Sequence, residues 1–170
     1  AELAHRIDKD TSGLLLVAKN PEAYTYLKEL FRKRDITKTY LALVAGNVAR
    51  DEGVIALSIA RSTKDFRKRV ASPREVEGAR SAETRFRVLR RFDGYTLLEV
   101  RPKTGRTHQI RSHLSSIGHP IACDKLYGGK RYACPAGLLR QFLHAAALEF
   151  TAPNGERVRL EAGLPKDLET

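Results

Sequence analysis

Hydrophobic and polar positions along the chain repeat with two different spacings, which predicts a mixture of strands and helices. Short apolar runs and period-two alternation are typical of strands. Apolar positions that recur every three or four residues are typical of helices that bury one face. The pattern places candidate strands at residues 14–18, 38–45, 53–60, 84–89, 95–101, 143–150 and 157–162.

The first predicted helix begins at Asn20-Pro21, because Asn is a good N-cap and Pro fits the first helical position. The apolar residues that follow share one face, while the basic residues of the segment are free to face outward. This apolar face consists of Ala23, Tyr26, Leu27, Leu30 and Phe31. We expect it to cover a sheet.

A second predicted helix follows the Thr104-Gly105 turn, with Thr107 as its N-cap and Gly118 at its end. The residues expected on its buried face are Ile110, Leu114 and Ile117. A short last helix is expected after Leu164.

Hairpin turns at Asp93-Gly94 and at Pro153-Asn154-Gly155 join neighbouring candidate strands. The sequence lacks the regular alternation of strands and crossover helices that a parallel sheet needs. We therefore predict an α+β fold with a mixed, mostly antiparallel sheet flanked by helices. A length of 170 residues fits one domain over residues 1–170.

The charge balance narrows the choice of partner. The chain has 31 Lys and Arg against 20 Asp and Glu, a formal net charge of +11. Such an excess favours a polyanion, either nucleic acid or an anionic membrane. No apolar run approaches the length of a membrane span, which favours nucleic acid.

Residues 61–74 concentrate this charge around a single acid, Asp65. The basic residues are Arg61, Lys64, Arg67, Lys68, Arg69 and Arg74. We interpret the segment as a long basic hairpin loop that clamps RNA phosphates without reading sequence. A solvated, flexible linker between two strands is the alternative.

The cysteines, Cys123 and Cys134, lack both a disulfide framework and the close pairing of dedicated zinc sites. We expect free thiols, no metal and a reducing cytosol.

Asp8 lies between Arg6 and Lys9 and is followed by a Thr-Ser-Gly turn. This positive field favours the ionised carboxylate, which could act as a nucleophile or a base. The alternative is that Asp8 and Asp10 only make turn hydrogen bonds ahead of a strand. From this segment alone the two interpretations are equally supported.

Three segments together resemble the RluA-type pseudouridine synthase family, in the same order as in the family. They are residues 5–19 (HRIDKDTSGLLLVAK), 38–44 (KTYLALV) and 102–114 (PKTGRTHQIRSHL). Weaker matches follow at residues 118–121, 124–129 and 143–145, so the resemblance covers roughly residues 5 to 150.

The resemblance implies the family fold and the isomerisation of uridine to pseudouridine in RNA, without a cofactor. Large-subunit ribosomal RNA is the expected substrate, and transfer RNA is possible. It also implies that Asp8 is the catalytic residue and that Arg111 forms an ion pair with it. Arg106 is the competing partner for Asp8, or a phosphate contact. Tyr40 would pack against the target base, although the sequence alone favours a core aromatic.

Further residues are expected to contact the substrate. Arg6 would fill the space that a flipped nucleotide leaves in the RNA, and Ile110 would supply an apolar wall. For the histidines a structural or phosphate-contact role is favoured over acid–base chemistry, and His108 is assigned to substrate binding. The other histidines to which this structural or phosphate-contact role applies are His113, His119 and His144.

Family members carry an upstream strand before the HRID motif, whereas His5 here follows only four residues. We expect that strand to be missing from this chain, and we expect a cytoplasmic monomer.

Two other functions are considered. A non-catalytic RNA-binding or ribosome-assembly module would explain the charge but not the three motifs. A glycosylase would release free uracil instead of rejoining it.

Overall fold

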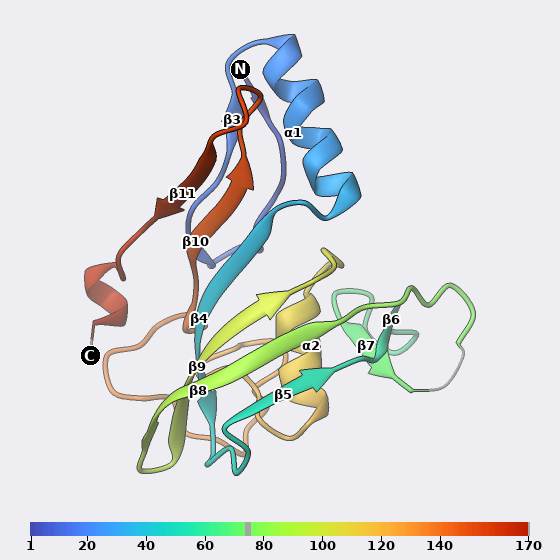
Figure 1. Cartoon of the computed structure of the whole chain (residues 1–170). Coiled ribbons are helices and arrows are strands. Elements are labelled where there is room, and N and C mark those ends of the chain that lie inside the picture. The colour runs from blue at the N-terminus through green and yellow to red at the C-terminus, as the bar shows by residue number, and fades with distance from the viewer. Residues whose placement is uncertain (74–75, 170) are drawn as a thin grey trace.

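A central sheet organises the fold, which is a computed structural model that describes residues 1–73 and 76–169 (Figure 1). In this described part the sheet has seven strands, in the order β11-β10-β4-β9-β8-β5 with β2 beside β10. All of its pairs are antiparallel except β2 with β10. The strands are β2 (Ser12–Gly13), β4 (Thr37–Ala45), β5 (Glu52–Ile55), β8 (Thr84–Phe92), β9 (Tyr95–Pro102), β10 (Leu143–Thr151) and β11 (Arg157–Glu161). The prediction of a mixed, mostly antiparallel sheet is confirmed.

Two small ribbons lie outside this sheet. Strand β1 (Glu2–Leu3) pairs with β3 (Val17–Ala18), and β6 (Ser58–Arg61) pairs with β7 (Arg69–Ser72). The helices are α1 (Pro21–Lys33), α2 (Gln109–Ser116) and a terminal 3-10 turn, η1 (Lys166–Leu168). No helix in the described residues is long and apolar enough to cross a membrane.

Helix α1 begins as its sequence predicts. The Asn20 side chain accepts a hydrogen bond from the Ala23 amide at 2.8 Å, and Pro21 is the first helical residue. Leu30 is buried on the predicted face and packs with Leu148 of β10. The helix ends at Lys33, and its C-cap, Arg34, has a left-handed φ of 63°.

Helix α2 begins differently from the prediction. Its N-cap is His108, with a φ of 53° and no side-chain cap, so Thr107 does not cap it. The reason is that the preceding loop is arranged around Gln109, whose Oε1 accepts from the Thr104 hydroxyl at 2.6 Å and from the Arg106 amide at 3.0 Å. Ile110 and Leu114 are buried as predicted, whereas Ile117 is 38% exposed because it lies beyond the last helical residue, Ser116.

Both helices cover the same face of the sheet. Leu148, which packs under α1, pairs with Lys38, and paired residues point to the same side. Ala42 lies on that side of β4, four residues beyond Lys38, and packs in the core that α2 covers. The opposite face packs against a loop and the C-terminal turn, through Ala122, Leu138, Phe142 and Leu168. Loops from the strands and helices on the first face can therefore meet between α1 and α2.

Two predicted strands are wrong in their extent. Residues 14–18 do not form one buried strand, because Gly13 is docked on β10 and the chain then turns to pair β3 with β1. Leu15 and Val17 are exposed as a result, at 38% and 50%. Residues 53–60 divide into β5 and β6, which belong to different sheets. At the break, the Leu57 carbonyl accepts a hydrogen bond from His113 Nε2 at 2.9 Å.

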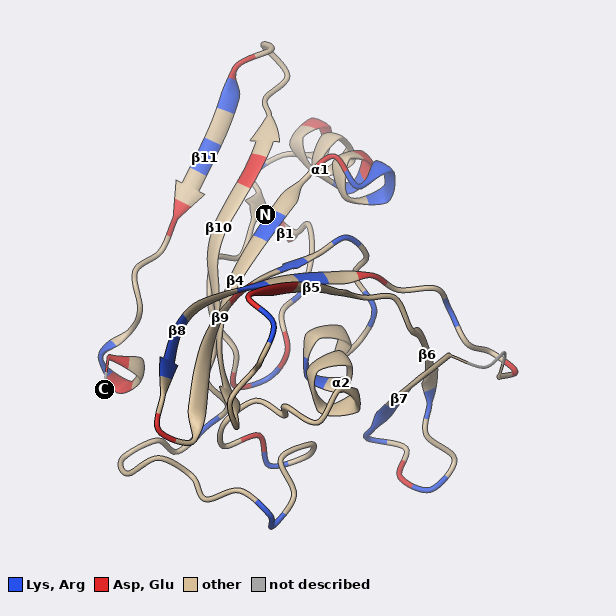
Figure 2. Ribbon diagram, turned by 60° about the horizontal axis from the view of Figure 1, so that its bottom comes forward, with Lys and Arg blue, Asp and Glu red and all other residues tan. Residues whose placement is uncertain are grey.

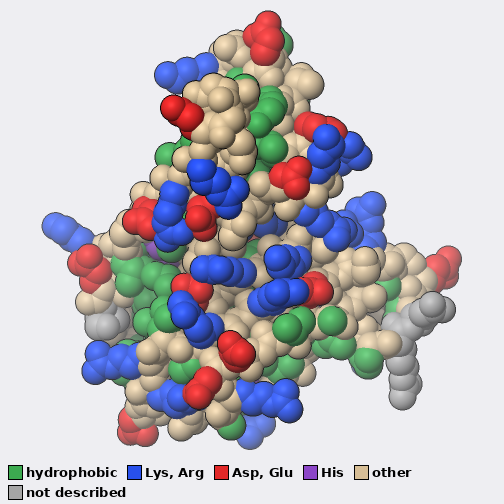
Figure 3. Space-filling view, viewed as in Figure 1, with side chains coloured by type: hydrophobic (Ala, Val, Ile, Leu, Met, Phe, Trp, Pro, Cys, Tyr) green, Lys and Arg blue, Asp and Glu red, His purple; other side chains and the backbone are tan. Residues whose placement is uncertain are grey.

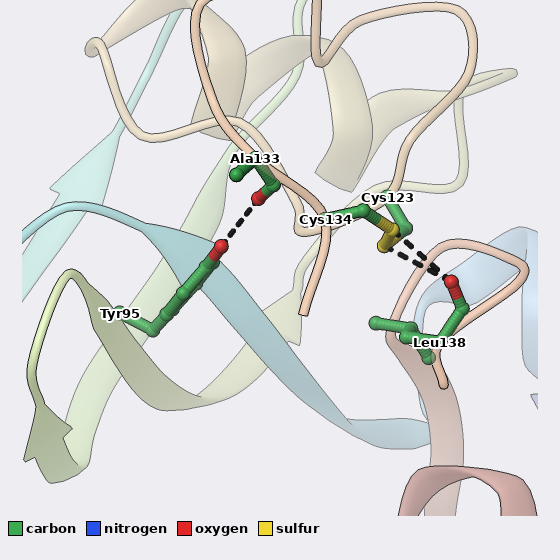
Figure 4. Close-up of a disulfide and its surroundings, with 5 residues drawn as sticks. All are labelled: Tyr95, Cys123, Ala133, Cys134 and Leu138. Carbon is green, nitrogen blue, oxygen red and sulfur yellow. Dashed lines mark hydrogen bonds between the residues drawn. A yellow bond between two sulfur atoms is a disulfide. The ribbon is translucent and has the colours of Figure 1, made fainter. Parts of the chain in front are cut away.

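The expectation of free thiols is also wrong. Cys123 and Cys134 form a disulfide, with Cα atoms 5.1 Å apart (Figure 4). The segment between them folds back on itself, and the Tyr95 hydroxyl donates to the Ala133 carbonyl next to Cys134. The Leu138 carbonyl oxygen lies beside both sulfurs. Spacing in the sequence could not show this loop closure.

Gly13 provides a test of how the N-terminal loop docks. Its φ is +113°, and an added Cβ would lie 2.2 Å from the Ala145 carbonyl oxygen. We expect G13A to lower the free energy of unfolding by about 2–4 kcal/mol, through strain and overpacking. Chemical denaturation measures this.

The matched control is G163A, where an added Cβ meets nothing within 4 Å. It should change stability by less than about 0.5 kcal/mol. Equal effects of the two substitutions would contradict the docking contact.

Candidate active site

A cationic cavity of about 860 Å³ lies between α1, the HRID loop and the loop that follows β9. Its acidic lining residues are Asp8 and Glu29. Its basic lining residues are Arg6, Lys28, Arg32, Arg34, Lys38, Lys103 and Arg106. In Figure 3, Lys and Arg side chains gather across the middle of the face, and Figure 2 shows the basic end of α1. The cavity therefore favours an anionic ligand.

Asp8 lies on a loop that is held to β10 and to the segment before it. The Gln141 side chain donates to the Lys9 carbonyl at 3.0 Å, and Arg140 donates to the Asp10 carbonyl at 2.9 Å. Asp10 is itself left-handed, with a φ of 67°. The Asp8 side chain is 19% exposed and lines the cavity. The carboxylate is thus held in place while one side stays open to a ligand.

Arg111 lies behind this carboxylate and contacts two acids. Its Nη1 is 3.6 Å from Asp8 Oδ2, while its Nε and Nη2 donate to Asp124 at 2.7 and 2.9 Å. Burial opposes the charge of Arg111, but the bonds and charge of Asp124 outweigh it and raise the pKa of Arg111. Arg106, the competing candidate, instead donates from Nε to the Ser81 carbonyl at 3.0 Å. Arg111 is therefore the candidate that lies at ion-pair distance from Asp8.

Asp124 is a site residue to which the sequence analysis gave no role. Its side chain is fully buried, and its Oδ1 also accepts from the amides of Leu126 and Tyr127 at 2.9 and 3.0 Å. The turn is tight, because a Cβ on Gly128 would lie 2.6 Å from the Asp124 carbonyl oxygen. The only signal in the sequence was the weak family match at residues 124–129.

Tyr127 is a second residue without an assigned role, and it joins three parts of the site. The centre of its ring is 5.1 Å from the Arg111 guanidinium. Its hydroxyl is 3.0 Å from His108 Nδ1 and accepts from the Arg69 amide at 2.7 Å. Burial lowers the pKa of His108, against the opposing charge of Asp8. A neutral His108 is therefore favoured. Through these contacts Tyr127 links α2 to the β6–β7 hairpin.

Tyr40 and Lys38 line the cavity from one face of β4. Burial, followed by the charge of Asp8, raises the pKa of Tyr40 to about 12, so its phenol stays protonated at neutral pH. Burial, followed by the charge of Arg34, lowers the pKa of Lys38 to about 8. Lys38 Nζ donates to the Thr104 carbonyl at 3.1 Å. Ile110 adds an apolar part to the same lining.

The structure brings only part of the predicted site together. The basic hairpin residues Lys64, Arg67, Lys68 and Arg69 do not line the cavity. Arg67 forms an ion pair with Asp65 at 2.8 Å, and the Arg69 amide donates to Tyr127 beside the site. The loop predicted over residues 61–74 is shorter than expected, because Arg69–Ser72 form strand β7, which pairs with β6 and leaves residues 62–68 between the two strands. Arg74 lies outside the described residues.

The remaining histidines make structural contacts. His113 bonds Thr84 and the Leu57 carbonyl, at 2.8 and 2.9 Å. His119 contacts the Ala45 carbonyl, and His144 lies 2.9 Å from the Ser12 hydroxyl. Among the described residues, no group of three or more His, Cys, Asp or Glu side chains could hold a metal ion.

The sequence and the fold have counterparts in known proteins. A family model described as RNA pseudouridylate synthase matches residues 1–116. The chain therefore belongs to the RNA pseudouridylate synthase family. A solved structure, titled Human RNA Pseudouridylate Synthase Domain Containing 1, is similar with a TM-score of 0.84 and 31% identity, over 96% of this chain and 69% of that one.

Two bacterial relatives cover nearly the whole chain. The Uncharacterized RNA pseudouridine synthase YlyB of Bacillus subtilis (strain 168) is 44% identical, over 98% of this chain and 53% of that protein. The Ribosomal large subunit pseudouridine synthase C of Vibrio cholerae is 42% identical, over 96% of this chain and 51% of that protein. The chain spans about half the length of these curated relatives.

His5 provides a test of how the HRID loop is anchored. Its Nε2 accepts from the Leu16 amide at 2.9 Å, and its ring stacks on Phe31 at 4.6 Å. Burial, followed by the charge of Lys38, lowers the pKa of His5 to about 4. Between pH 6.5 and pH 4 an unfolded histidine binds a proton that the folded His5 does not. Stability should therefore fall as the pH falls through this range.

We expect H5Q to lessen this loss by roughly 1–3 kcal/mol, because a glutamine oxygen can accept the same bond without titrating. Urea denaturation from pH 7 to pH 4 measures the difference. Stability curves that run parallel for the parent protein and H5Q would rule out the contribution of His5.

Proposed function

We propose that this chain isomerises uridine to pseudouridine in structured RNA, with Asp8 as the catalytic residue. Large-subunit ribosomal RNA is the proposed substrate, as the name of the Vibrio cholerae relative suggests, and transfer RNA is the second candidate. One observation carries the proposal: the Asp8 carboxylate faces a cationic cavity and lies 3.6 Å from the buried Arg111.

The reaction is an isomerisation that needs no oxidant and no cofactor. The bond from ribose C1′ to uracil N1 breaks, the uracil turns, and a bond from C1′ to C5 forms. N1 gains a proton and C5 releases one, so atoms and electrons balance. The target nucleotide must first leave its stack, at a cost of a few kcal/mol that contacts to the RNA backbone offset.

Asp8 has two possible roles in breaking the first bond. Its carboxylate can attack C1′ and form a sugar ester, like the nucleophile of a retaining glycosidase. Alternatively, it can remove the 2′ proton and leave a glycal. Both routes need a carboxylate that faces the ribose, and Arg111 holds its positive charge 3.6 Å from the Asp8 carboxylate.

Other residues that line the cavity hold the substrate. Tyr40 packs against the detached uracil, and its protonated phenol is suited to donating a hydrogen bond. Ile110 supplies an apolar wall. Arg6 fills the space that the flipped nucleotide leaves, and Arg106 contacts phosphate. His108 does not line the cavity; it lies 3.0 Å from the Tyr127 hydroxyl, and we assign it a polar contact with the substrate at the edge of the site.

The basic hairpin contributes to RNA affinity outside the cavity. We propose that Lys64, Arg67, Lys68 and Arg69 contact phosphates without reading sequence. Since Arg67 is paired with Asp65, its share of this attraction is reduced.

We propose that the protein acts as a monomer, since Asp8, Arg111 and Tyr40 all come from one chain. A cytoplasmic location is proposed from the RNA substrate alone, because the disulfide removes the argument from free thiols.

The direct test replaces the Asp8 carboxylate by an amide. We expect D8N to form no detectable pseudouridine in unmodified ribosomal RNA while its RNA affinity stays within about threefold of the parent, since one side chain among many contacts changes. Chemical mapping of pseudouridine and a binding titration measure the two effects.

The matched control is D10N. Asp10 lies in the same loop, and Arg140 is bonded to its backbone carbonyl and not to its side chain. It should keep the parent's activity. Full activity of D8N would exclude Asp8 as the catalytic residue. RNA binding by the parent protein without product would favour a binding module, and free uracil would favour a glycosylase.

A further inference from the structure

Phe66 is an exposed aromatic ring that the proposed chemistry does not use. It lies in the hairpin tip, residues 62–68 between β6 and β7, and 75% of its surface is exposed. Phe92, at the end of β8, is less exposed at 42%. Figures 1 and 2 show β6 and β7 beside α2, away from the central sheet.

The hairpin tip is ordered by its own bonds, so the ring is presented by a fixed turn. The buried Ser62 hydroxyl accepts from the amides of Lys64 and Asp65, both at 3.2 Å. The Lys68 amide donates to the Asp65 carbonyl at 2.9 Å, and the Ser62 amide donates to the Lys68 carbonyl at 3.1 Å. Little ordering is then needed when a ligand covers the ring.

The charges around the ring indicate what kind of ligand that is. Asp65 is the only acid in residues 61–69, and it is bound by Arg67 at 2.8 and 3.0 Å. Lys64 and Lys68 flank this pair in the sequence. An aromatic ring among cations suits a single-stranded nucleic acid, whose bases stack while its phosphates meet the charges. A purely apolar protein partner would have to desolvate these cations.

The hairpin is also fixed relative to the candidate active site. The Arg69 amide, one residue beyond the hairpin tip, donates to the Tyr127 hydroxyl at 2.7 Å. The ring of Tyr127 contacts Arg111, which pairs with Asp8. A base bound at Phe66 would therefore be held in a defined position relative to Asp8.

We propose that Phe66 is a stacking site for an unpaired base of the RNA substrate, outside the cavity that takes the target uridine. The proposal rests on the proposed function, since it assumes an RNA partner. Through this stacking the hairpin would favour single-stranded segments of RNA, while its basic residues contact phosphates.

A tryptophan reporter tests the stacking directly, because the chain has no tryptophan of its own. The variant F66W is titrated with an oligouridine and with a fully paired RNA duplex of the same phosphate count. We expect the oligouridine to quench the indole emission strongly and the duplex to leave it nearly unchanged. F92W is the matched control, since Phe92 is also exposed and lies beside Arg90. Its emission should not change with either RNA.

Binding of the same oligouridine to F66A and F66L separates stacking from simple burial. Loss of the ring should weaken binding on the order of 10-fold in both variants, while F66W keeps the parent's affinity. Parent affinity in F66A, or emission of F66W that stays constant while the oligouridine binds, would overturn the proposal and point to a partner other than RNA.

Equal quenching by the duplex would also overturn it, because a fully paired duplex offers no unpaired base to stack. None of these readouts needs turnover. Quenching without pseudouridine would therefore support the stacking site even if the proposed catalysis were wrong.

Discussion

The buried Arg111 guanidinium is the constraint on which the rest of the site depends. A buried charge that loses its partner costs several kcal/mol, so the fold has to supply acids around it. Asp124 meets that need with a bidentate pair at 2.7 and 2.9 Å, and Asp8 adds a longer contact at 3.6 Å. Three separate segments must therefore fold together before the site exists: the HRID loop, α2 and the turn at residues 124–128.

The two acids differ in a way that fits different roles. Asp124 is fully buried and bonded by backbone amides, so it is a fixed partner that sets the orientation of Arg111. Asp8 is partly exposed and faces the cavity, where it receives the charge of Arg111 without being tied to it by a close bond. This arrangement leaves the Asp8 carboxylate available to a ligand. Left-handed residues occur beside all three segments, at Asp10, His108 and Cys123. Such conformations concentrate at functional sites, where the surrounding structure holds them.

Local signals in the sequence predicted much of this molecule. The Asn20-Pro21 cap gave the start of α1, the Asp93-Gly94 turn gave the β8–β9 hairpin, and the three motifs led to Asp8, Tyr40 and Arg111. What the sequence could not predict depends on side-chain contacts and loop paths that form only in the folded chain. Docking of Gly13 on Ala145 divides the expected strand at residues 14–18, and the bonds of Gln109 displace the expected cap at Thr107. Asp124 and Tyr127 acquire a role only where they meet Arg111, and the disulfide depends on the path of the loop between its cysteines.

The most direct test of this account is the rate of pseudouridine formation by D124N at saturating RNA, measured beside its RNA affinity and its circular dichroism. If Asp124 orients Arg111 toward Asp8, the rate should fall on the order of 100-fold, as small misplacements in active sites do, while RNA affinity stays unchanged. The matched control is D167N, which removes a half-exposed partner of Arg140 and should keep the parent's rate. A folded D124N protein with the parent's rate would contradict the account.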